Sequence, residues 1–218
     1  MQIINLSVNY PDKRVFDNFS CTFKKGQVTA IMGDSGVGKT TLLNCIAGLL
    51  DYAGDIIDGG EVSYIFQQPR LIESATVMQN LLYVCGGKKG KEKVPKIREL
   101  LKIVSLDKEE NTLVSALSGG MQSRVALARA FLYESDTLLM DEPFKSLDVG
   151  LATRIRETLV ELLKLHPRTV ILVTHDVDEA IELGDKIMVL KGRPAQIVLE
   201  EESKADGIRK KLFDCLVD

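Results

Sequence analysis

The stretch Gly33-Asp34-Ser35-Gly36-Val37-Gly38-Lys39-Thr40 decides the fold, because it matches G-x-x-x-x-G-K-S/T at every fixed position. Residues 28–32, before it, are apolar and predict a short buried strand. Residues 41–47, after it, predict a helix that ends before Gly48. A strand, a glycine-rich loop and a helix in this order are the context that a phosphate-binding loop requires. The stretch therefore predicts a nucleoside triphosphate site.

The residue types of this loop suit phosphate chemistry. Its three glycines let the backbone curl, so that consecutive N–H groups and the start of the helix face phosphate oxygens. Lys39 is expected to reach the β- and γ-phosphates, and the Thr40 hydroxyl is expected to ligate Mg²⁺. The alternative is a glycine-rich turn that binds nothing. The residues expected to bind nucleotide here are Gly33, Asp34, Ser35, Gly36, Val37, Gly38, Lys39, Thr40 and Thr41.

Composition narrows the class of protein. The chain has 218 residues, 45% of them hydrophobic, and 28 Lys and Arg against 31 Asp and Glu, which gives a net charge of −3. This balance argues against a dedicated nucleic-acid binder. No apolar run has the length of a membrane span, and the first residues lack the pattern of a signal peptide, so a cytoplasmic location is expected. The four cysteines lack metal-ligand spacing and are expected to be reduced thiols.

The periodicity of apolar residues predicts the architecture. Alternation at Ile4, Leu6 and Val8, and again from Phe19 to Phe23, predicts half-buried antiparallel strands. Helical spacing dominates residues 74–133, whereas residues 137–140 and 169–173 are short apolar runs typical of parallel strands buried on both faces. We therefore expect an α/β fold: one domain over 1–218, with a β subdomain and nucleotide-binding core at about 1–73 and 134–218, and an inserted α-helical subdomain at about 74–133.

A lysine run interrupts the helical segment at Lys88, Lys89, Lys91 and Lys93. It could form an anion-binding patch, but a solvated loop between two helices is the favoured interpretation.

Two carboxylates follow an apolar run, where a strand of an α/β sheet opens to ligand. Asp141 is expected to hold Mg²⁺ together with Thr40, and Glu142 is expected to polarise the attacking water as a general base. A pair of surface carboxylates is the alternative. The phosphate-binding loop upstream favours the catalytic interpretation.

Residues 117–120, Leu-Ser-Gly-Gly, precede a helix rich in small residues. Taken alone they predict an N-cap serine, Ser118, beside a flexible pair, Gly119 and Gly120. Together with the other motifs they resemble the signature of the ATP-binding cassette ATPases, and the resemblance covers nearly the whole chain. It implies a P-loop NTPase core with a mostly parallel sheet, and it implies that these three residues act on nucleotide held by the other subunit of a dimer.

The resemblance also assigns expected roles to four further residues. Gln67 looks like the family's glutamine-loop residue, which touches Mg²⁺ or water, with Gln68 as the alternative. His175 looks like the switch histidine at the γ-phosphate. Asp148, in Ser146-Leu147-Asp148, matches the loop that crosses to the opposite subunit, although such a triplet is also an ordinary helix start. Tyr10 stands where the family stacks an aromatic ring on adenine, and a plain strand-end tyrosine is its rival.

Three positions depart from the commonest family pattern, namely Asp34, Met121 and Lys145. In having methionine at position 121, the chain resembles the importer branch of the family that serves nitrate, sulfonates, taurine and thiamine precursors. The resemblance implies an ATP-hydrolysing subunit that forms a homodimer around two ATP and drives transmembrane permease subunits from the cytoplasmic face of the cell membrane. An extracytoplasmic solute-binding protein would be an indirect partner, and no nucleic acid would be bound.

The resemblance also implies that the segment from Gln67 to Asn80 forms the groove that receives a short cytoplasmic helix of the permease. Leu71, Ile72, Val77 and Met78 would supply apolar contact, or would instead pack the core of the helical subdomain. Two rival functions remain: a soluble ATPase of the same family in DNA repair, translation or cofactor assembly, and a P-loop kinase. A kinase would need neither the Leu-Ser-Gly-Gly segment nor His175.

Overall fold

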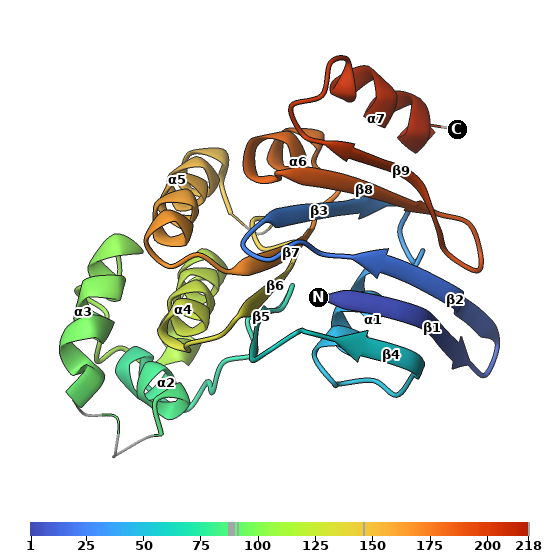
Figure 1. The fold of residues 1–218 in the computed structure, drawn as a ribbon. Coiled ribbons are helices and arrows are strands. Elements are labelled where there is room, and N and C mark those ends of the chain that lie inside the picture. Colours follow the sequence, from blue (N-terminus) through green and yellow to red (C-terminus); the bar gives the residue numbers. More distant parts are fainter. Residues whose placement is uncertain (87–89, 91, 146, 218) are drawn as a thin grey trace. The chain divides into compact units, whose positions relative to one another are not determined.

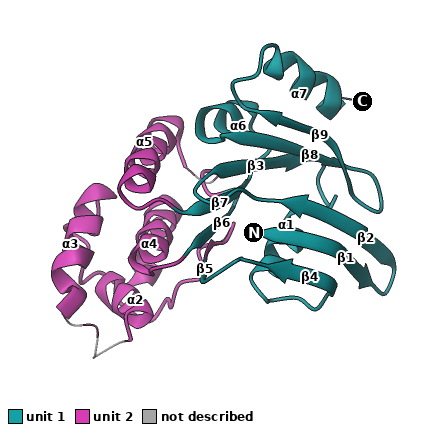
Figure 2. Ribbon diagram, in the orientation of Figure 1, with its two compact units in different colours: residues 1–62, 136–142, 168–218 teal, residues 63–135, 143–167 magenta. Residues whose placement is uncertain are grey.

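The structure, a computed structural model, describes residues 1–86, 90, 92–145 and 147–217. Its contacts divide the chain into two compact units, which Figure 2 colours separately. The first unit holds residues 1–62, 136–142 and 168–218, and the second holds residues 63–135 and 143–167. The predicted helical segment falls in the second unit, which also includes residues 143–167. Lys88, Lys89 and Lys91 of the lysine run, and Ser146, lie outside the described residues.

The first unit contains a three-stranded antiparallel sheet in the order β2-β1-β4, formed by β1 (Gln2–Tyr10), β2 (Lys13–Thr22) and β4 (Ala53–Ile57). The predicted alternation is wrong at one position. Ile4 is 37% exposed, whereas Ile3, Leu6 and Val8 are buried. Asn5 has a φ of +53°, and the pairing register shifts between Ile3 and Leu6. This irregularity brings residues 3 and 6 to the same face of the sheet.

The larger sheet carries the apolar runs. Five of its strands follow one another in the first unit in the order β6-β7-β3-β8-β9 (Figure 1). They are β3 (Val28–Gly33), β6 (Thr137–Asp141), β7 (Thr169–Val173), β8 (Lys186–Lys191) and β9 (Gln196–Glu202). The first four pair in parallel, and β9 pairs antiparallel to β8. Every residue of β6 and β7 is buried, which confirms the prediction of strands covered on both faces.

Three helices pack on this sheet within the first unit. Helix α1 (Lys39–Ile46) contacts β3, β6 and β7. Helices α6 (Val177–Leu183) and α7 (Ile208–Val217) share a core with β3 and β8, in which Met32, Ala180 and Leu212 are fully buried. Burying such side chains supplies the main favourable free energy of folding.

The second unit is mostly helical and comprises α2 (Val77–Val84), α3 (Val94–Ile103), a short 3-10 turn at Val114–Ala116, α4 (Gly119–Leu132) and α5 (Val149–Leu165). Strand β5 (Val62–Ile65) begins at the boundary and continues into this unit. The helical spacing read from the sequence is confirmed, since Ile97, Leu100, Leu101 and Val104 are buried. Among the described residues, no helix has the length and apolar character needed to cross a membrane.

The four cysteines are free thiols. Burial raises the pKa of Cys21 to about 12 and that of Cys45 to about 11. Both thiols therefore stay protonated at neutral pH, which makes them poor nucleophiles and poor metal ligands.

Substitution of Gly33, at the end of β3, tests how tightly the phosphate-binding loop is fixed to the sheet. Its φ is +138°, and a Cβ atom there would lie 2.1 Å from the backbone oxygen of Leu190 in β8. Gly26 is a matched control, because its φ is also positive, at +74°, but a Cβ atom would meet nothing within 4 Å. We expect Gly26→Ala to lower the free energy of unfolding by about 1–2 kcal/mol through backbone strain alone. Gly33→Ala should lower it by clearly more, because the β8 backbone must also move.

Urea titration followed by circular dichroism measures both values. Equal losses in the two variants would show that the loop is not held against β8 as described.

Candidate functional site

The phosphate-binding loop joins β3 to α1, as the sequence predicts. Helix α1 begins at Lys39 with Gly38 as its N-cap residue. Lys39 is only 8% exposed, and its Nζ donates to the backbone oxygens of Gly33, at 2.6 Å, and Asp34, at 2.9 Å. The backbone carbonyls of the loop thus hold the ammonium group of Lys39 in place. Asp34, Ser35 and Thr40 are exposed, and Thr41 is half-buried.

The antiparallel sheet forms one wall of this loop. A Cβ atom on Gly38, which has a φ of +129°, would lie 2.6 Å from Cγ1 of Val15 and 3.0 Å from Cζ of Phe16. Both neighbours are buried residues of β2. Glycine at this position therefore permits the close approach of β2 to the start of α1.

Thr40 and Asp141 meet in space although 101 residues separate them in the sequence. Thr40 Oγ1 donates to Asp141 Oδ2 at 2.8 Å. Asp141 is the last residue of β6 and is 4% exposed. A hydroxyl and a carboxylate are hard oxygen ligands of the kind that Mg²⁺ takes in phosphate sites, usually only one or two from the protein. Among the described residues there is no cluster of three or more His, Cys, Asp or Glu side chains that could hold a metal alone.

Glu142 follows directly in a strained conformation. Its φ is +47°, a region that costs a non-glycine residue about 1–3 kcal/mol and that is enriched at functional sites. Its backbone N–H donates to the carbonyl of Val173 at 2.9 Å, which fixes it to the end of β7. Its side chain is 17% exposed, and Oε1 lies 3.6 Å from Nδ1 of His175, whose side chain is 60% exposed. A partly buried carboxylate thus lies beside an accessible imidazole.

A buried polar pair that sequence reasoning missed positions His175. Thr174 Oγ1 donates to Glu179 Oε2 at 2.6 Å and accepts from the N–H of Asp176 at 3.0 Å. Asp176 is the N-cap of α6 and accepts from the N–H groups of Asp178 and Glu179. His175 is therefore held between a locked threonine and a helix cap. The cap could have been recognised from the sequence, because Asp176 is followed three residues later by Glu179, with acidic residues in the first turn of the helix.

The first unit therefore brings five predicted residues together. Strands β3, β6 and β7 are parallel, and Asp141 pairs with Val173, as Ile31 does from the other side. Because their carboxyl ends share one edge of the sheet, the loop after β3 and the residues after β6 and β7 converge there. The residues concerned are Lys39, Thr40, Asp141, Glu142 and His175.

Tyr10 also lies in the first unit, as the last residue of β1, paired with Lys13 of β2. Its side chain is 43% exposed, so a ring face is accessible.

The signature residues and Asp148 belong to the second unit and are helix caps there. Ser118 is the N-cap of α4, and its Oγ accepts from the N–H of Met121 at 3.3 Å. Gly119 begins this helix beside Gly120, and Ser118 and Gly119 are exposed. Asp148 is the exposed N-cap of α5 and accepts from the N–H of Leu151 at 2.9 Å. Within one chain, Ser118 and Asp148 therefore both act as N-caps of helices.

The segment after Gln67 is held by Arg129 and Asn80, whose hydrogen bonds the sequence did not predict. Arg129 donates to the carbonyls of Pro69 and Arg70, at 3.1 and 2.8 Å. Burial lowers the pKa of its guanidinium, which nevertheless stays charged at neutral pH. Asn80 is 2% exposed and bonds to both the N–H and the carbonyl of Ile72. Gln67 itself is exposed at the start of this segment.

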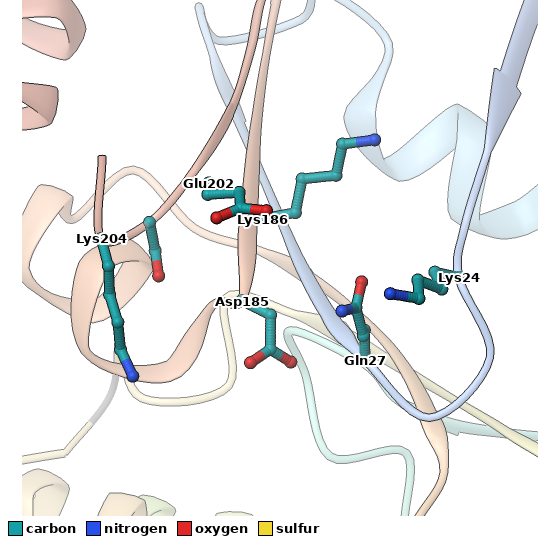
Figure 3. Close-up of a pocket in the computed structure, with 7 residues that line it drawn as sticks. Lys24, Gln27, Asp185, Lys186, Glu202 and Lys204 are labelled. Carbon is teal, nitrogen blue, oxygen red and sulfur yellow. The ribbon is translucent and has the colours of Figure 1, made fainter. Parts of the chain in front are cut away.

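A separate pocket of about 360 Å³ opens at the other edge of the larger sheet (Figure 3). It lies where β3 and β8 begin and where β9 ends. In the view of Figure 3, Lys24 and Gln27 lie to one side of Asp185, and Lys204 lies to the other. The phosphate-binding loop follows the last residue of β3 instead. This pocket is therefore distinct from the loop site.

Comparisons with known proteins agree with this geometry. A family profile described as ABC transporter matches residues 16–145. An aliphatic sulfonates import ATP-binding protein of Burkholderia cenocepacia is 34% identical over 211 residues, which is 93% of this chain and 77% of that protein. A protein of the same name from Bacillus subtilis is 40% identical over 192 residues, covering 84% of this chain and 75% of that one.

Solved structures show the same fold. The chain superposes on cbiO1 of Clostridium perfringens, part of the ABC transporter complex cbiONQ, with a TM-score of 0.82 and 27% identity, over 98% of this chain and 92% of that one. It superposes on a dimeric ATP-binding cassette in a post-hydrolysis state, bound to ADP and Pi, with a TM-score of 0.81 and 28% identity, over 94% and 99% of the two chains. The chain therefore belongs to the ABC transporter family, as an ATP-binding subunit that hydrolyses ATP.

Proposed function

We propose that ATP is hydrolysed at the edge of the sheet where β3, β6 and β7 end. The observation that carries the proposal is the convergence of Lys39, Thr40, Asp141, Glu142 and His175 within the first unit. In this proposal the loop from Gly33 to Thr41 binds the phosphates through its backbone N–H groups, and Lys39 neutralises the β- and γ-phosphates.

Mg²⁺ fits the Thr40 and Asp141 pair. The two oxygens lie 2.8 Å apart and are of the chemical type that this ion prefers. When bound, Mg²⁺ would neutralise charge that develops on the phosphate oxygens. Gln67 is proposed as a further contact to the ion or to water, on the strength of the family resemblance.

Glu142 is proposed as the general base. Its carboxylate is partly buried and fixed to β7 through its backbone, so that it can accept a proton from water attacking the γ-phosphate. His175, 3.6 Å away, would contact the γ-phosphate through its exposed ring. The Thr174 and Glu179 pair, together with the Asp176 cap, would keep the backbone at His175 in place.

The complete site would need two copies of the chain. Ser118, Gly119 and Gly120 start a 14-residue helix whose exposed N-terminus suits an anion. We propose that they contact the nucleotide bound by the partner copy, with Asp148 crossing in the same direction. The dimeric cassette with ADP and Pi supports this arrangement. Tyr10 is proposed to stack on adenine through its accessible ring.

The membrane partner is proposed from the relatives, whose names describe ATP-binding proteins for aliphatic sulfonate import. We propose that the chain drives import of a small solute such as an organic sulfonate, bound to permease subunits at the cytoplasmic face of the membrane. A solute-binding protein on the other side would deliver the solute.

The structure narrows the surface that could receive the permease. Val77 is fully buried and packs the second unit, so it supplies no surface contact. Ile72 is 43% exposed, and Leu71 and Met78 are half-buried, in the segment that Arg129 and Asn80 brace. We propose these three residues as the apolar part of the docking surface.

Glu142→Gln tests the catalytic assignment. The amide keeps the shape of the side chain but cannot accept a proton, so we expect ATP binding to persist while hydrolysis falls by about 10²- to 10⁴-fold. Glu161→Gln, an exposed glutamate of α5, is the matched control and should hydrolyse ATP at the parental rate. Phosphate release and ATP titration measure the two quantities. Parental hydrolysis by the Glu142 variant would exclude this residue as the base.

Ile72→Glu tests the docking surface. A charge in an apolar contact should weaken docking, and we expect transport to fall by about tenfold or more, while ATPase activity of the isolated subunit is spared. Leu165→Glu, at a side chain that is 73% exposed, is the control and should leave transport unchanged. Both rates are measured with the isolated subunit and with the complex in vesicles. Transport that is unaffected by Ile72→Glu would place the permease elsewhere.

A further inference from the structure

A second lysine contacts the phosphate-binding loop. Lys13 is the first residue of β2 and faces Tyr10 across the turn between β1 and β2. Its side chain is half-buried, and Nζ donates to the backbone oxygen of Gly36 at 2.5 Å. Neither the sequence motif nor the roles proposed above include this residue.

The contact fixes a peptide at the tip of the loop. Gly36 has a φ of +75°, and the N–H of Val37 donates to the carbonyl of Asp34 at 3.3 Å, which closes a tight turn. Because a peptide unit is planar, the N–H of Val37 points away from the Gly36 carbonyl. Lys13 binds the carbonyl on one side of the Gly36–Val37 peptide. The N–H of Val37, on the opposite side of that peptide, is therefore kept pointing into the loop.

The two lysines bind three of the backbone carbonyls of the loop. Lys39 takes those of Gly33 and Asp34, and Lys13 takes that of Gly36. A carbonyl oxygen that turned toward a bound phosphate would repel it, whereas a carbonyl held by an ammonium group keeps its partial negative charge neutralised. Since Lys13 comes from β2, which also packs against Gly38, the antiparallel sheet both walls the loop and orients it.

We propose that Lys13 is a positioning residue of the nucleotide site, which preorganises the tip of the loop for the β- and γ-phosphates of ATP. The inference rests on the proposed function, in that residues 33–41 bind those phosphates. Preorganisation of this kind raises affinity because the loop does not have to be ordered when the ligand arrives.

The test compares Lys13→Met, Lys13→Arg and Arg14→Met. Methionine keeps length and apolar packing but has no donor, whereas arginine retains a charged donor. Arg14 is the matched control: it is an adjacent cation whose bonds run to Asn9 and Asp17 on the exposed hairpin and not to the loop. Dissociation constants for ATP, ADP and AMP, and KM and kcat for hydrolysis, are measured for each variant.

We expect Lys13→Met to raise the dissociation constants for ATP and ADP by about three- to tenfold, which is the usual effect of losing one hydrogen bond. AMP, which lacks the β-phosphate, should change little. KM should rise while kcat stays near the parental value, since Lys13 does not act on the reacting water. Lys13→Arg should recover most of the affinity, and Arg14→Met should bind all three nucleotides like the parent.

Three results would overturn the proposal: parental ATP affinity in Lys13→Met, equal weakening of ATP and AMP, or equal weakening in Arg14→Met. The last two would indicate general damage to the hairpin. A further variant, Lys39→Ala, distinguishes failure of the inference about Lys13 from failure of the proposed function. If Lys39→Ala loses ATP binding while Lys13→Met does not, only the inference about Lys13 fails. If Lys39→Ala also binds ATP normally, the proposed phosphate site itself is wrong.

Discussion

The hydrogen bond from Thr40 to Asp141 depends on a single constraint, the parallel pairing of β3, β7 and β6 in one register. Strands β3 and β6 are not neighbours, because β7 lies between them. Two strand spacings correspond to roughly 10 Å, and the loop after β3 must cross that distance for Thr40 to reach Asp141. The same register places Glu142 against Val173 and His175 just beyond it. Any slip between these strands would separate the loop from the carboxylates.

The loop itself is confined by neighbouring backbone and side chains. Gly33 is pressed against the carbonyl of Leu190, Gly38 against Val15 and Phe16, and the Gly36 carbonyl is held by Lys13. These contacts come from the parallel sheet on one side and from the antiparallel sheet on the other. A loop that is fixed in this way can offer its N–H groups to phosphate without first becoming ordered. The three-stranded sheet thus supports the loop, although none of the five residues that converge at the ends of β3, β6 and β7 belongs to it.

The sequence was sufficient to predict the loop, the carboxylate pair after β6, and the buried parallel strands, because each rests on a local pattern with a direct physical cause. It failed at Ile4, where a positive φ at Asn5 reverses the expected alternation. It also could not show that Val77 is wholly buried, since exposure depends on which helices pack together.

Contacts between residues that are distant in the sequence could not be predicted from it either. Lys13 with Gly36, and Arg129 with the carbonyls of Pro69 and Arg70, join segments that carry no mutual signal in the sequence. Thr174 and Glu179 are only five residues apart, yet their pairing depends on both being buried. The roles of Ser118 and Asp148 raise a different difficulty, because in one chain both are simple helix caps. Their proposed chemistry belongs to a pair of chains.

A crystal structure of the Glu142→Gln chain with ATP and Mg²⁺ tests the central claim most directly. Our account predicts two copies around two nucleotides, with the phosphates of each ATP on residues 33–41 of one copy and against Ser118 of the other. It also predicts the metal between Thr40, Asp141 and the phosphates. ATP bound elsewhere, or enclosed by a single copy without Ser118 from a partner, would contradict it.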